Sequence, residues 1–225
     1  MYQVPADQVT RVARSIALVG DLGILPVVEL PEVKQAEPLL EALCAAGLPG
    51  AEITLRTPAG LAAIRLLAEA FPTALIGAGT VRTTEDAARV IDAGAQFVVS
   101  PGTDPDVVAF CVERDVLVMP GVCTPTEIQA ALRAGAPLLK FFPAEPSGGI
   151  PFLKALCGPF RDVGFVPTGG INSNNLASYL ELPQVRACGG SWMVSPAMIA
   201  DGDFDRIGAL SAAAVRIVGE ARKDG

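Results

Sequence analysis

Residues 138–145 read LLKFFPAE, a short run of large apolar side chains that contains a single lysine. Such a composition is typical of a strand in a parallel sheet, which is buried on both of its faces. Lysine is almost never fully buried unless its ammonium group is paired. Lys140 therefore either reaches solvent through the register of the strand or places an amine in a dry part of the protein.

Seven further apolar runs recur along the chain, and together with residues 138–144 they give eight expected strands. Their starting points lie roughly 20 to 27 residues apart, about the length of one strand and one crossover helix. The eight runs are ILPVVEL (24–30), AEITLRT (51–57), ALIGAGT (74–80), FVVSPG (97–102), VLVMPGV (116–122), LLKFFPA (138–144), FVPTGG (165–170) and CGGSWMV (188–194).

The segments between these runs carry apolar residues at three- and four-residue spacing, which predicts amphipathic helices. Before the first strand, the same spacing follows Asp7, a suitable N-cap, so we expect an extra amphipathic helix rather than a signal peptide. The other expected caps are Thr57, Thr83 and Thr124, and the expected closing glycines are Gly47, Gly94 and Gly135.

Eight strand–helix units follow one another without a linker or a shift in composition. We therefore expect one domain over residues 1–225: an α/β, (β/α)8 TIM barrel at about 24–222 with an extra N-terminal helix at about 7–20. A doubly wound open sheet is the alternative, but no GxGxxG motif lies between a strand and a helix. In a TIM barrel the active site lies at the carboxyl ends of the strands.

The composition narrows the class of function. A net charge of −7 argues against a nucleic-acid or anionic-membrane partner, and no run is long and charge-free enough to span a bilayer. The chain has no histidine, the commonest metal ligand and general base. Its five cysteines are widely spaced without a CxxC pair, so we expect reduced thiols, no metal site and a cytoplasmic protein.

The second run, AEITLRT, contains charged residues at alternate positions. Glu52, Thr54 and Arg56 would share one face of the strand, because side chains alternate between faces. In a barrel the apolar face lies under the helices, so these three side chains are expected in the interior. The arrangement is either a structural ion pair or part of a functional site, where perturbed charges are enriched.

The same alternation turns Lys140 to the interior with Leu138 and Phe142. Desolvation there disfavours the ammonium ion and favours a neutral, nucleophilic amine. Such an amine can condense with a ketone to form a Schiff base, and a carboxylate such as Glu52 could then move protons. The competing interpretation is a buried Lys–Glu pair without a covalent role.

Paired glycines stand where the seventh and eighth strands end. Small residues expose backbone N–H groups to an anion, and in barrels the loops after these two strands often bind phosphate. Thr80 and the SPG of residues 100–102 end two earlier strands and leave room for a ligand. Cys123 lacks a histidine partner and is expected to be structural. The candidates for the phosphate loop are Gly169, Gly170, Gly190 and Ser191.

Several of these strings resemble one known family. EITLRT, GAGTV, SPG, PTGGI, GGSW and above all KFFPAE are similar, in this order, to motifs of the 2-keto-3-deoxy-6-phosphogluconate (KDPG) aldolases. The resemblance covers about residues 20–210. It implies a metal-free, cofactor-free lyase of the Entner–Doudoroff pathway, usually trimeric. It would reversibly cleave KDPG to pyruvate and glyceraldehyde 3-phosphate.

The resemblance also implies roles for particular residues. Lys140 would form the Schiff base and Glu52 would be the general acid/base. Arg56, with Thr80 beside it, would hold the pyruvate carboxylate, which suits a bidentate guanidinium. The resemblance further assigns Pro101 and Phe142 to the pyruvate pocket, Thr168 to the substrate hydroxyls, and Gly169, Gly170, Gly190 and Ser191 to the phosphate.

Other functions stay open at this point. The enzyme could prefer the 6-phosphogalactonate epimer or 4-hydroxy-2-oxoglutarate, although ILPVVEL lacks the arginine of galactonate-type relatives. A barrel that only binds phosphorylated sugar acids is the non-enzyme alternative, and it would not need an amine in a dry pocket. Catalytic rate, epimer preference, oligomer size and the role of the N-terminal extension are not fixed by the sequence.

Overall fold

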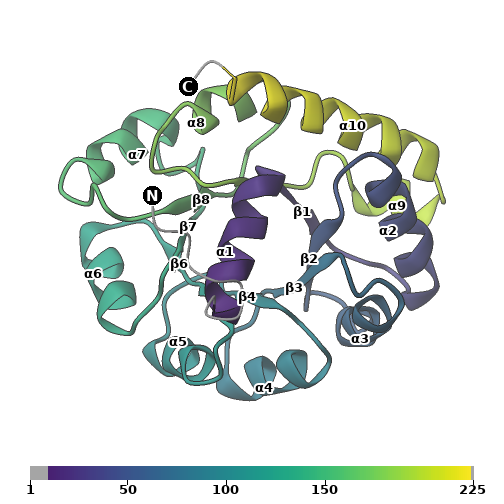
Figure 1. The fold of residues 1–225 in the computed structure, drawn as a ribbon, viewed down its shortest axis with the longest axis horizontal. Helices are drawn as coiled ribbons and strands as arrows, with labels where there is room; N and C mark the ends of the chain where they lie inside the picture. The colour runs from purple at the N-terminus through teal and green to yellow at the C-terminus, as the bar shows by residue number, and fades with distance from the viewer. Residues whose placement is uncertain (1–9, 224–225) are drawn as a thin grey trace.

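The computed structural model describes residues 10–223 as an α/β fold in which helices surround a curled set of parallel strands (Figure 1). A six-stranded sheet and a three-stranded sheet contribute to it. The strands are β1 (Ile24–Val28), β2 (Gly50–Thr54), β3 (Leu75–Gly79), β4 (Phe97–Val99), β5 (Leu117–Met119), β6 (Gly121–Val122), β7 (Leu139–Phe141), β8 (Phe165–Pro167) and β9 (Cys188–Gly190).

All eight expected strands are present, and the fifth is divided into β5 and β6. Pro120 separates the two pieces, because its nitrogen has no hydrogen to donate to a ladder. The larger sheet has the order β5-β4-β3-β2-β1-β9 and the smaller one β6-β7-β8. On one side the chain itself runs from the larger sheet into the smaller one, from β5 through Pro120 to β6. On the other side Thr168, directly after β8, forms an isolated parallel bridge with Gly189 of β9.

A helix follows each strand, apart from the break between β5 and β6. The helices are α1 (Arg11–Leu22), the 3-10 helix η2 (Val33–Gln35), α2 (Ala36–Ala45), α3 (Gly60–Ala70), α4 (Thr84–Asp92), α5 (Pro105–Val112), α6 (Pro125–Arg133), α7 (Gly149–Cys157), α8 (Leu176–Leu180), α9 (Pro196–Ala200) and α10 (Phe204–Ala221).

The predicted helix boundaries are mostly correct. Thr83 and Thr124 cap α4 and α6 through their side chains, and Gly47, Gly94 and Gly135 have positive φ values where helices end. The prediction for Thr57 is wrong. Helix α3 begins only at Gly60, and the Thr57 hydroxyl instead donates to the Leu30 carbonyl at 2.7 Å.

Two apolar cores lie on opposite faces of the strands. The larger one packs alternate strand residues, such as Ile53 and Val98, against the surrounding helices. The smaller one, which includes Leu25, Phe97 and Leu138, lies on the other face and draws residues from both sheets and from α1. Because the strand interior is filled by side chains, the free space for a ligand lies at the strand ends.

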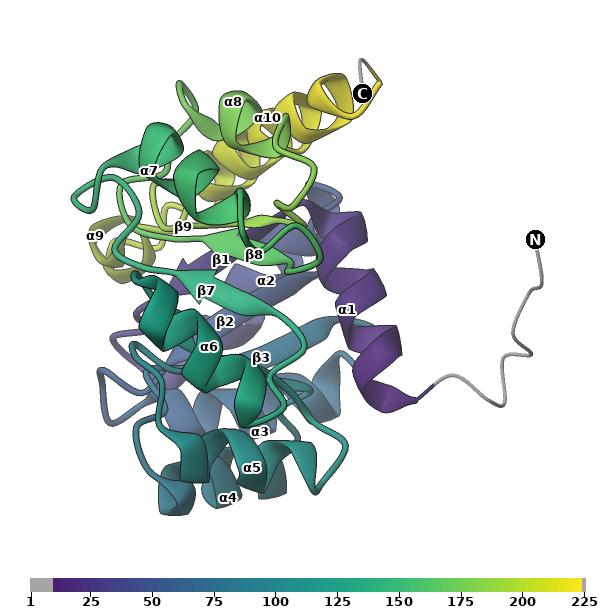
Figure 2. The same cartoon turned by 90° about the vertical axis from the view of Figure 1, so that its left-hand side faces the viewer.

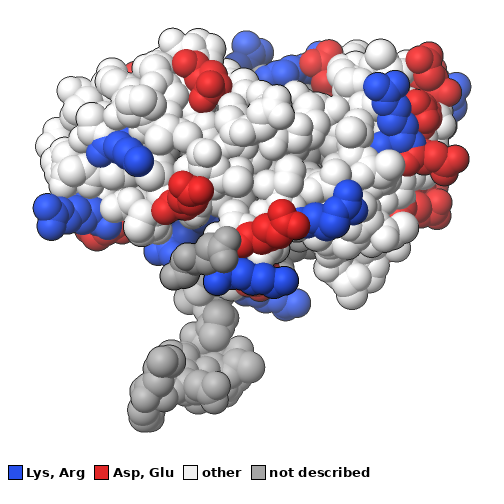
Figure 3. All heavy atoms as spheres, turned by 90° about the horizontal axis from the view of Figure 1, so that it is seen from above, with Lys and Arg blue, Asp and Glu red and all other residues white. Residues whose placement is uncertain are grey.

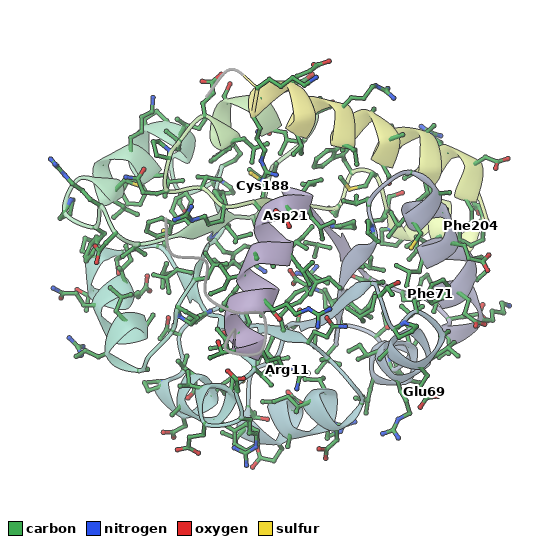
Figure 4. All side chains as sticks on the ribbon, viewed as in Figure 1. Arg11, Asp21, Glu69, Phe71, Cys188 and Phe204 are labelled. Atoms are coloured by element: carbon green, nitrogen blue, oxygen red, sulfur yellow. The ribbon has the colours of Figure 1, made fainter. Side chains whose placement is uncertain are left out.

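The expected N-terminal helix is present as α1, which crosses the middle of the strands in Figure 1 and lies at one end of them in Figure 2. Thr10 is its N-cap, whereas the expected cap Asp7 lies outside the described residues. Figure 4 labels Arg11 and Asp21 near its two ends. The Arg11 guanidinium donates to the Ala95 carbonyl, just before β4. Helix α1 therefore covers the amino ends of the strands and leaves the carboxyl ends open.

Charged side chains of both signs are mixed on one face of the molecule (Figure 3). On the face shown in Figure 3, Lys and Arg side chains alternate with Asp and Glu side chains rather than gathering in one basic patch. Within residues 10–223, no helix is both long and apolar enough to span a membrane.

Candidate active site

Lys140 in the middle of β7 and Glu52 in the middle of β2 form a buried ion pair. The Lys140 Nζ lies 3.6 Å from the Glu52 Oε1, and the two residues are only 5% and 3% exposed. The Nζ also lies 5.0 Å from the centre of the Phe142 ring. The alternation of side chains along each strand thus turns both charges inward, and the amine is held in a dry place beside one carboxylate.

Space for the Glu52 carboxylate comes from Gly79 on the adjacent strand β3. A Cβ atom at Gly79 would lie 2.2 Å from the Glu52 Oε1 and 2.8 Å from its Cγ. No side chain of any size fits there while Glu52 keeps this position. The glycine of GAGT is therefore needed for the ion pair, and not only to leave room for a ligand.

The three polar residues of the second strand have different surroundings. The Thr54 hydroxyl donates to the Val28 carbonyl at 2.9 Å, so it ties β2 to β1. Arg56 lies beyond the last residue of β2, and its side chain is 48% exposed. Its Nη1 is 3.8 Å from the Glu29 Oε2. Glu52 is thus inside the strands as expected, whereas Arg56 lies on the loop above them.

A cavity of about 210 Å³ opens at the carboxyl ends of β1, β7, β8 and β9. Phe142, whose ring lies beside the Lys140 amine, forms part of its wall. Arg56 brings a cation to the wall, and the glycine turns after β8 and β9 bring backbone groups. The residues that line it are Val27, Arg56, Phe142, Thr168, Gly169, Gly170, Ile171, Gly189, Gly190 and Ser191.

Two candidates from the sequence lie apart from this cavity. Thr80 follows β3 with a left-handed backbone, φ 61°, and is not among the lining residues. Pro101 follows β4 and lines a separate hollow of about 210 Å³ with Ser100 and Arg82. Both stand at the same end of the strands as Glu52, but the structure does not bring them to the wall that carries Arg56.

The turn after β8 has the backbone that its glycines allow. Gly169 and Gly170 have φ values of 101° and 84°, which L side chains rarely adopt. The Gly170 carbonyl accepts hydrogen bonds from the side-chain amides of Asn172 and Asn175, both at 3.1 Å. This end of the cavity is therefore a fixed backbone turn rather than a set of charged side chains.

The turn after β9 is fixed by packing. A Cβ atom at Gly190 would lie 2.0 Å from the Trp192 ring, so this ring occupies the space beside the glycine. Gly189 is restricted in the same way by the Thr168 side chain, at 2.4 Å. The Trp192 ring therefore packs against the glycine of this turn.

Sequence reasoning missed Glu29, the partner of Arg56. A signal was present, since Glu29 is a charged residue directly after β1, and active-site residues are expected where strands end. Two of the cysteines are buried thiols: burial raises the pKa of Cys111 to about 11 and also raises that of Cys157. Among residues 10–223, no three His, Cys, Asp or Glu side chains are grouped as a metal site requires.

Comparison with known proteins gives consistent matches. The model of the family described as KDPG and KHG aldolase matches residues 16–210. The 2-dehydro-3-deoxy-phosphogluconate aldolase of Treponema pallidum is 48% identical over 196 residues, which are 87% of this chain and 93% of that protein. The protein of the same name from Pseudomonas aeruginosa is 43% identical, over 95% of this chain and 97% of its own.

A solved structure shares the fold closely. It is the KDPG aldolase of Legionella pneumophila with pyruvate captured at low pH as a covalent carbinolamine intermediate. The TM-score is 0.86 at 42% sequence identity, and the match covers 88% of this chain and 97% of that one. The parallel strands, the surrounding helices and the strand ends that carry the cavity are thus those of a known group of enzymes.

Proposed function

The chain belongs to the KDPG and KHG aldolase family, and on this basis we propose that it cleaves KDPG to pyruvate and glyceraldehyde 3-phosphate through a Schiff base on Lys140. The observation that carries the proposal is the buried amine of Lys140, 3.6 Å from the Glu52 carboxylate and next to a cavity at the strand ends. The relatives are named for this reaction, and the Legionella structure holds pyruvate covalently.

The geometry supports the following sequence of steps. The Lys140 ammonium first passes a proton to the Glu52 carboxylate, and the neutral amine attacks the C2 ketone to give a carbinolamine. The Glu52 carboxylic acid returns the proton to the carbinolamine hydroxyl, which leaves as water, so that an iminium ion and the Glu52 carboxylate remain. Glu52 takes the proton of the C4 hydroxyl, the C3–C4 bond breaks, and its electron pair moves to the iminium to form an enamine. Glyceraldehyde 3-phosphate leaves at this point. Protonation of the enamine at C3 and hydrolysis of the iminium release pyruvate and regenerate the amine.

The cavity wall supports assignments for the two charged ends of the substrate. The Arg56 guanidinium suits the carboxylate, since its planar fork can donate two parallel hydrogen bonds. The glycine turns, with Gly169, Gly170, Gly190 and Ser191, offer backbone groups to the phosphate. Thr168 also lines the cavity and suits a substrate hydroxyl. Thr80 and Pro101 lie outside the cavity and would reach the substrate only if it extends toward β3 and β4.

Two sequence comparisons bear on substrate preference. The gluconate epimer is favoured, because the chain is 48% identical to a phosphogluconate aldolase but 29% identical to the protein of the native KDPGal structure. Activity on 4-hydroxy-2-oxoglutarate is the second candidate. The Escherichia coli relative at 40% identity is named KHG/KDPG aldolase.

The wider organisation is also part of the proposal. We propose that the two sheets close into one (β/α)8 barrel within a single domain. The Thr168–Gly189 bridge supports this, since it joins the β8 edge of the smaller sheet to the β9 edge of the larger one, while the chain runs from β5 into β6 through Pro120 at the other pair of edges. An experimental structure with the Thr168–Gly189 bridge open would contradict it. Five free cysteines support a reducing, cytoplasmic location.

A homotrimer is proposed from the family. Three large apolar side chains are left exposed on successive helices: Val112 on α5, Leu132 on α6 and Phe152 on α7. Such side chains are candidates for a subunit interface. Light scattering that gives the mass of a monomer would withdraw the trimer.

The proposed activity is tested by replacing the amine. Lys140→Ala should abolish KDPG cleavage, measured as pyruvate release, because no other buried amine is available among the described residues. Lys154→Ala is the matched control, since Lys154 lies exposed on α7 and should keep wild-type activity. Retention of cleavage by Lys140→Ala would contradict the Schiff-base mechanism.

A further inference from the structure

A hydrogen bond outside the cavity joins two loops of the candidate site. The Tyr179 hydroxyl of α8 donates to the Glu145 Oε1 at 2.5 Å, and Tyr179 is fully buried. Burial, and then the Glu145 carboxylate, raise the pKa of this tyrosine. Its hydroxyl therefore keeps its proton and remains a donor. Glu145 belongs to the loop that follows β7 and Lys140, while α8 follows the glycine turn of β8.

Glu145 also contacts both glycines of that turn. Its backbone N–H donates to the Gly169 carbonyl at 3.0 Å. Its Cβ and Cγ occupy the space beside Gly170, where an added Cβ atom would lie 2.6 Å from each. The side chain thus lies against Gly170 before its carboxylate reaches Tyr179. Glu145, a single residue of the loop after β7, therefore contacts both glycines of the turn after β8.

The same turn is also held from the segment that leads into α8. Asn172 and Asn175 hold the Gly170 carbonyl, and Asn175 stands directly before α8. The Tyr179 N–H donates to the Asn175 carbonyl at 3.2 Å, so these two residues lie one helical turn apart. A shift of Tyr179 away from Glu145 would move Asn175 and, with it, the peptide that follows Gly170. The hydrogen bond between Tyr179 and Glu145 consequently connects the two groups of contacts that fix the turn: those of Glu145 and those of Asn175.

We propose that Glu145 and Tyr179 are positioning residues that set the distance between the Schiff-base lysine and the phosphate end of the substrate. The inference rests on the proposed function. KDPG links its reacting C2 and its phosphate through a short carbon chain, so the loops that hold these ends must keep a fixed separation. Pyruvate has no phosphate and needs only the lysine end. Loss of the hydrogen bond should therefore impair KDPG but not pyruvate.

The first test compares these two ligands in Tyr179→Phe, which keeps the ring and removes the donor. We expect kcat/KM for KDPG to fall about tenfold, mainly through KM, as for a lost hydrogen bond to a charged group. The pyruvate concentration that half-saturates borohydride trapping should stay unchanged. Ser15→Ala is the control, because it removes a hydrogen bond to the Gln96 carbonyl at the opposite end of the strands and should leave both values at the wild-type level.

A second pair of variants changes Glu145, which is exposed, and therefore tests the proposal even if Tyr179→Phe fails to fold. Glu145→Ala removes the acceptor and should reproduce the KDPG defect, whereas Glu145→Gln keeps an acceptor oxygen and should restore most of the activity. Equal losses for KDPG and pyruvate, or no loss for KDPG, would overturn the proposal. Wild-type protein that neither cleaves KDPG nor traps pyruvate would instead refute the proposed function.

Discussion

At the scale of single residues, the position of the Glu52 carboxylate depends on a glycine, Gly79, which has no side chain to fill the space beside it. Gly79 of β3 is paired with Thr54 in the strand register, but it lies beside the Glu52 side chain, and any Cβ atom there would overlap the carboxylate. Glu52 is 3% exposed, so it has no solvent-filled space into which it could withdraw. The distance from this carboxylate to the Lys140 amine is therefore set by the backbone of two neighbouring strands.

We expect Gly79→Ala to lower kcat for KDPG by about 100-fold, since a displacement of about 1 Å at a reacting group can cost that much. The added methyl group pushes the Glu52 carboxylate away from Lys140. Steady-state kinetics measures the effect, and circular dichroism verifies the fold. Gly219→Ala is the matched control, because a Cβ atom there meets nothing within 4 Å. An unchanged kcat in Gly79→Ala would contradict this role.

Side-chain alternation predicted the interior positions of Lys140 and Glu52 from the sequence alone, because both lie within regular strands. The same rule failed for Arg56, since β2 ends at Thr54 and alternation has no meaning in the loop beyond it. The contact between Gly79 and Glu52 was also out of reach, because it depends on the register of two strands. Sequence patterns therefore predicted which charged residues lie in the interior, but not the distance between the Lys140 amine and the Glu52 carboxylate.

At the scale of elements, the start of α6 shows how a local motif fixes the turn after β6, the strand next to the one that carries Lys140. Helix α6 connects β6 to β7. The Glu127 Oε2 accepts hydrogen bonds from the Cys123 and Thr124 N–H groups at 2.7 and 2.8 Å, and the Thr124 hydroxyl accepts from the Glu127 N–H. This capping box follows from the TPTE sequence. Thr57 is not a cap, because its hydroxyl instead makes a tertiary hydrogen bond to the Leu30 carbonyl.

Glu127 should make the stability depend on pH. Although burial alone would raise its pKa, the hydrogen bonds from Cys123 and Thr124 lower it overall. The native state therefore favours the ionised form, and the stabilisation is present at neutral pH and is lost as the pH falls through the folded pKa. Glu127→Ala should lower the free energy of unfolding by about 1 kcal/mol at pH 7. The difference should shrink below about pH 4, the ordinary range of glutamate.

Urea titrations of both proteins at several pH values measure this difference. Glu113→Ala provides a control, since Glu113 is exposed at the end of α5 and should show no such dependence. A destabilisation of Glu127→Ala that stays constant down to pH 3 would show that the carboxylate charge is not involved.

At the scale of the whole molecule, the two ends of the strands have separate tasks. Helix α1 covers the amino ends with Val19, which is fully buried in the inner core. The cavity lies at the carboxyl ends, and Phe142 of its wall lies beside the Lys140 amine that pairs with Glu52. The sequence predicted both the helix and the eight strands, since each has its own periodicity. It did not predict what α1 covers, because an amphipathic pattern gives a helix an apolar face without specifying its partner.

This division predicts that stability and activity can be changed independently. Val19→Ala should lower the free energy of unfolding by about 2 kcal/mol through the cavity that it leaves in the inner core. Because the site lies at the other end of the strands, kcat and KM for KDPG should stay at wild-type values under conditions where the variant is folded. Denaturant unfolding and steady-state kinetics on the same sample provide the measurement. A fall in kcat that matches the loss of stability would show that the two ends are coupled.

The central claim is that the Lys140 amine bonds covalently to the substrate ketone. Borohydride reduction in the presence of saturating pyruvate, followed by peptide mass mapping, tests this claim most directly. The account predicts one reduced pyruvyl adduct per chain, on the peptide that contains Lys140, and none in Lys140→Ala. A folded protein that gives no adduct, or an adduct on another lysine, would contradict the account and return Lys140 to the role of a buried structural partner for Glu52.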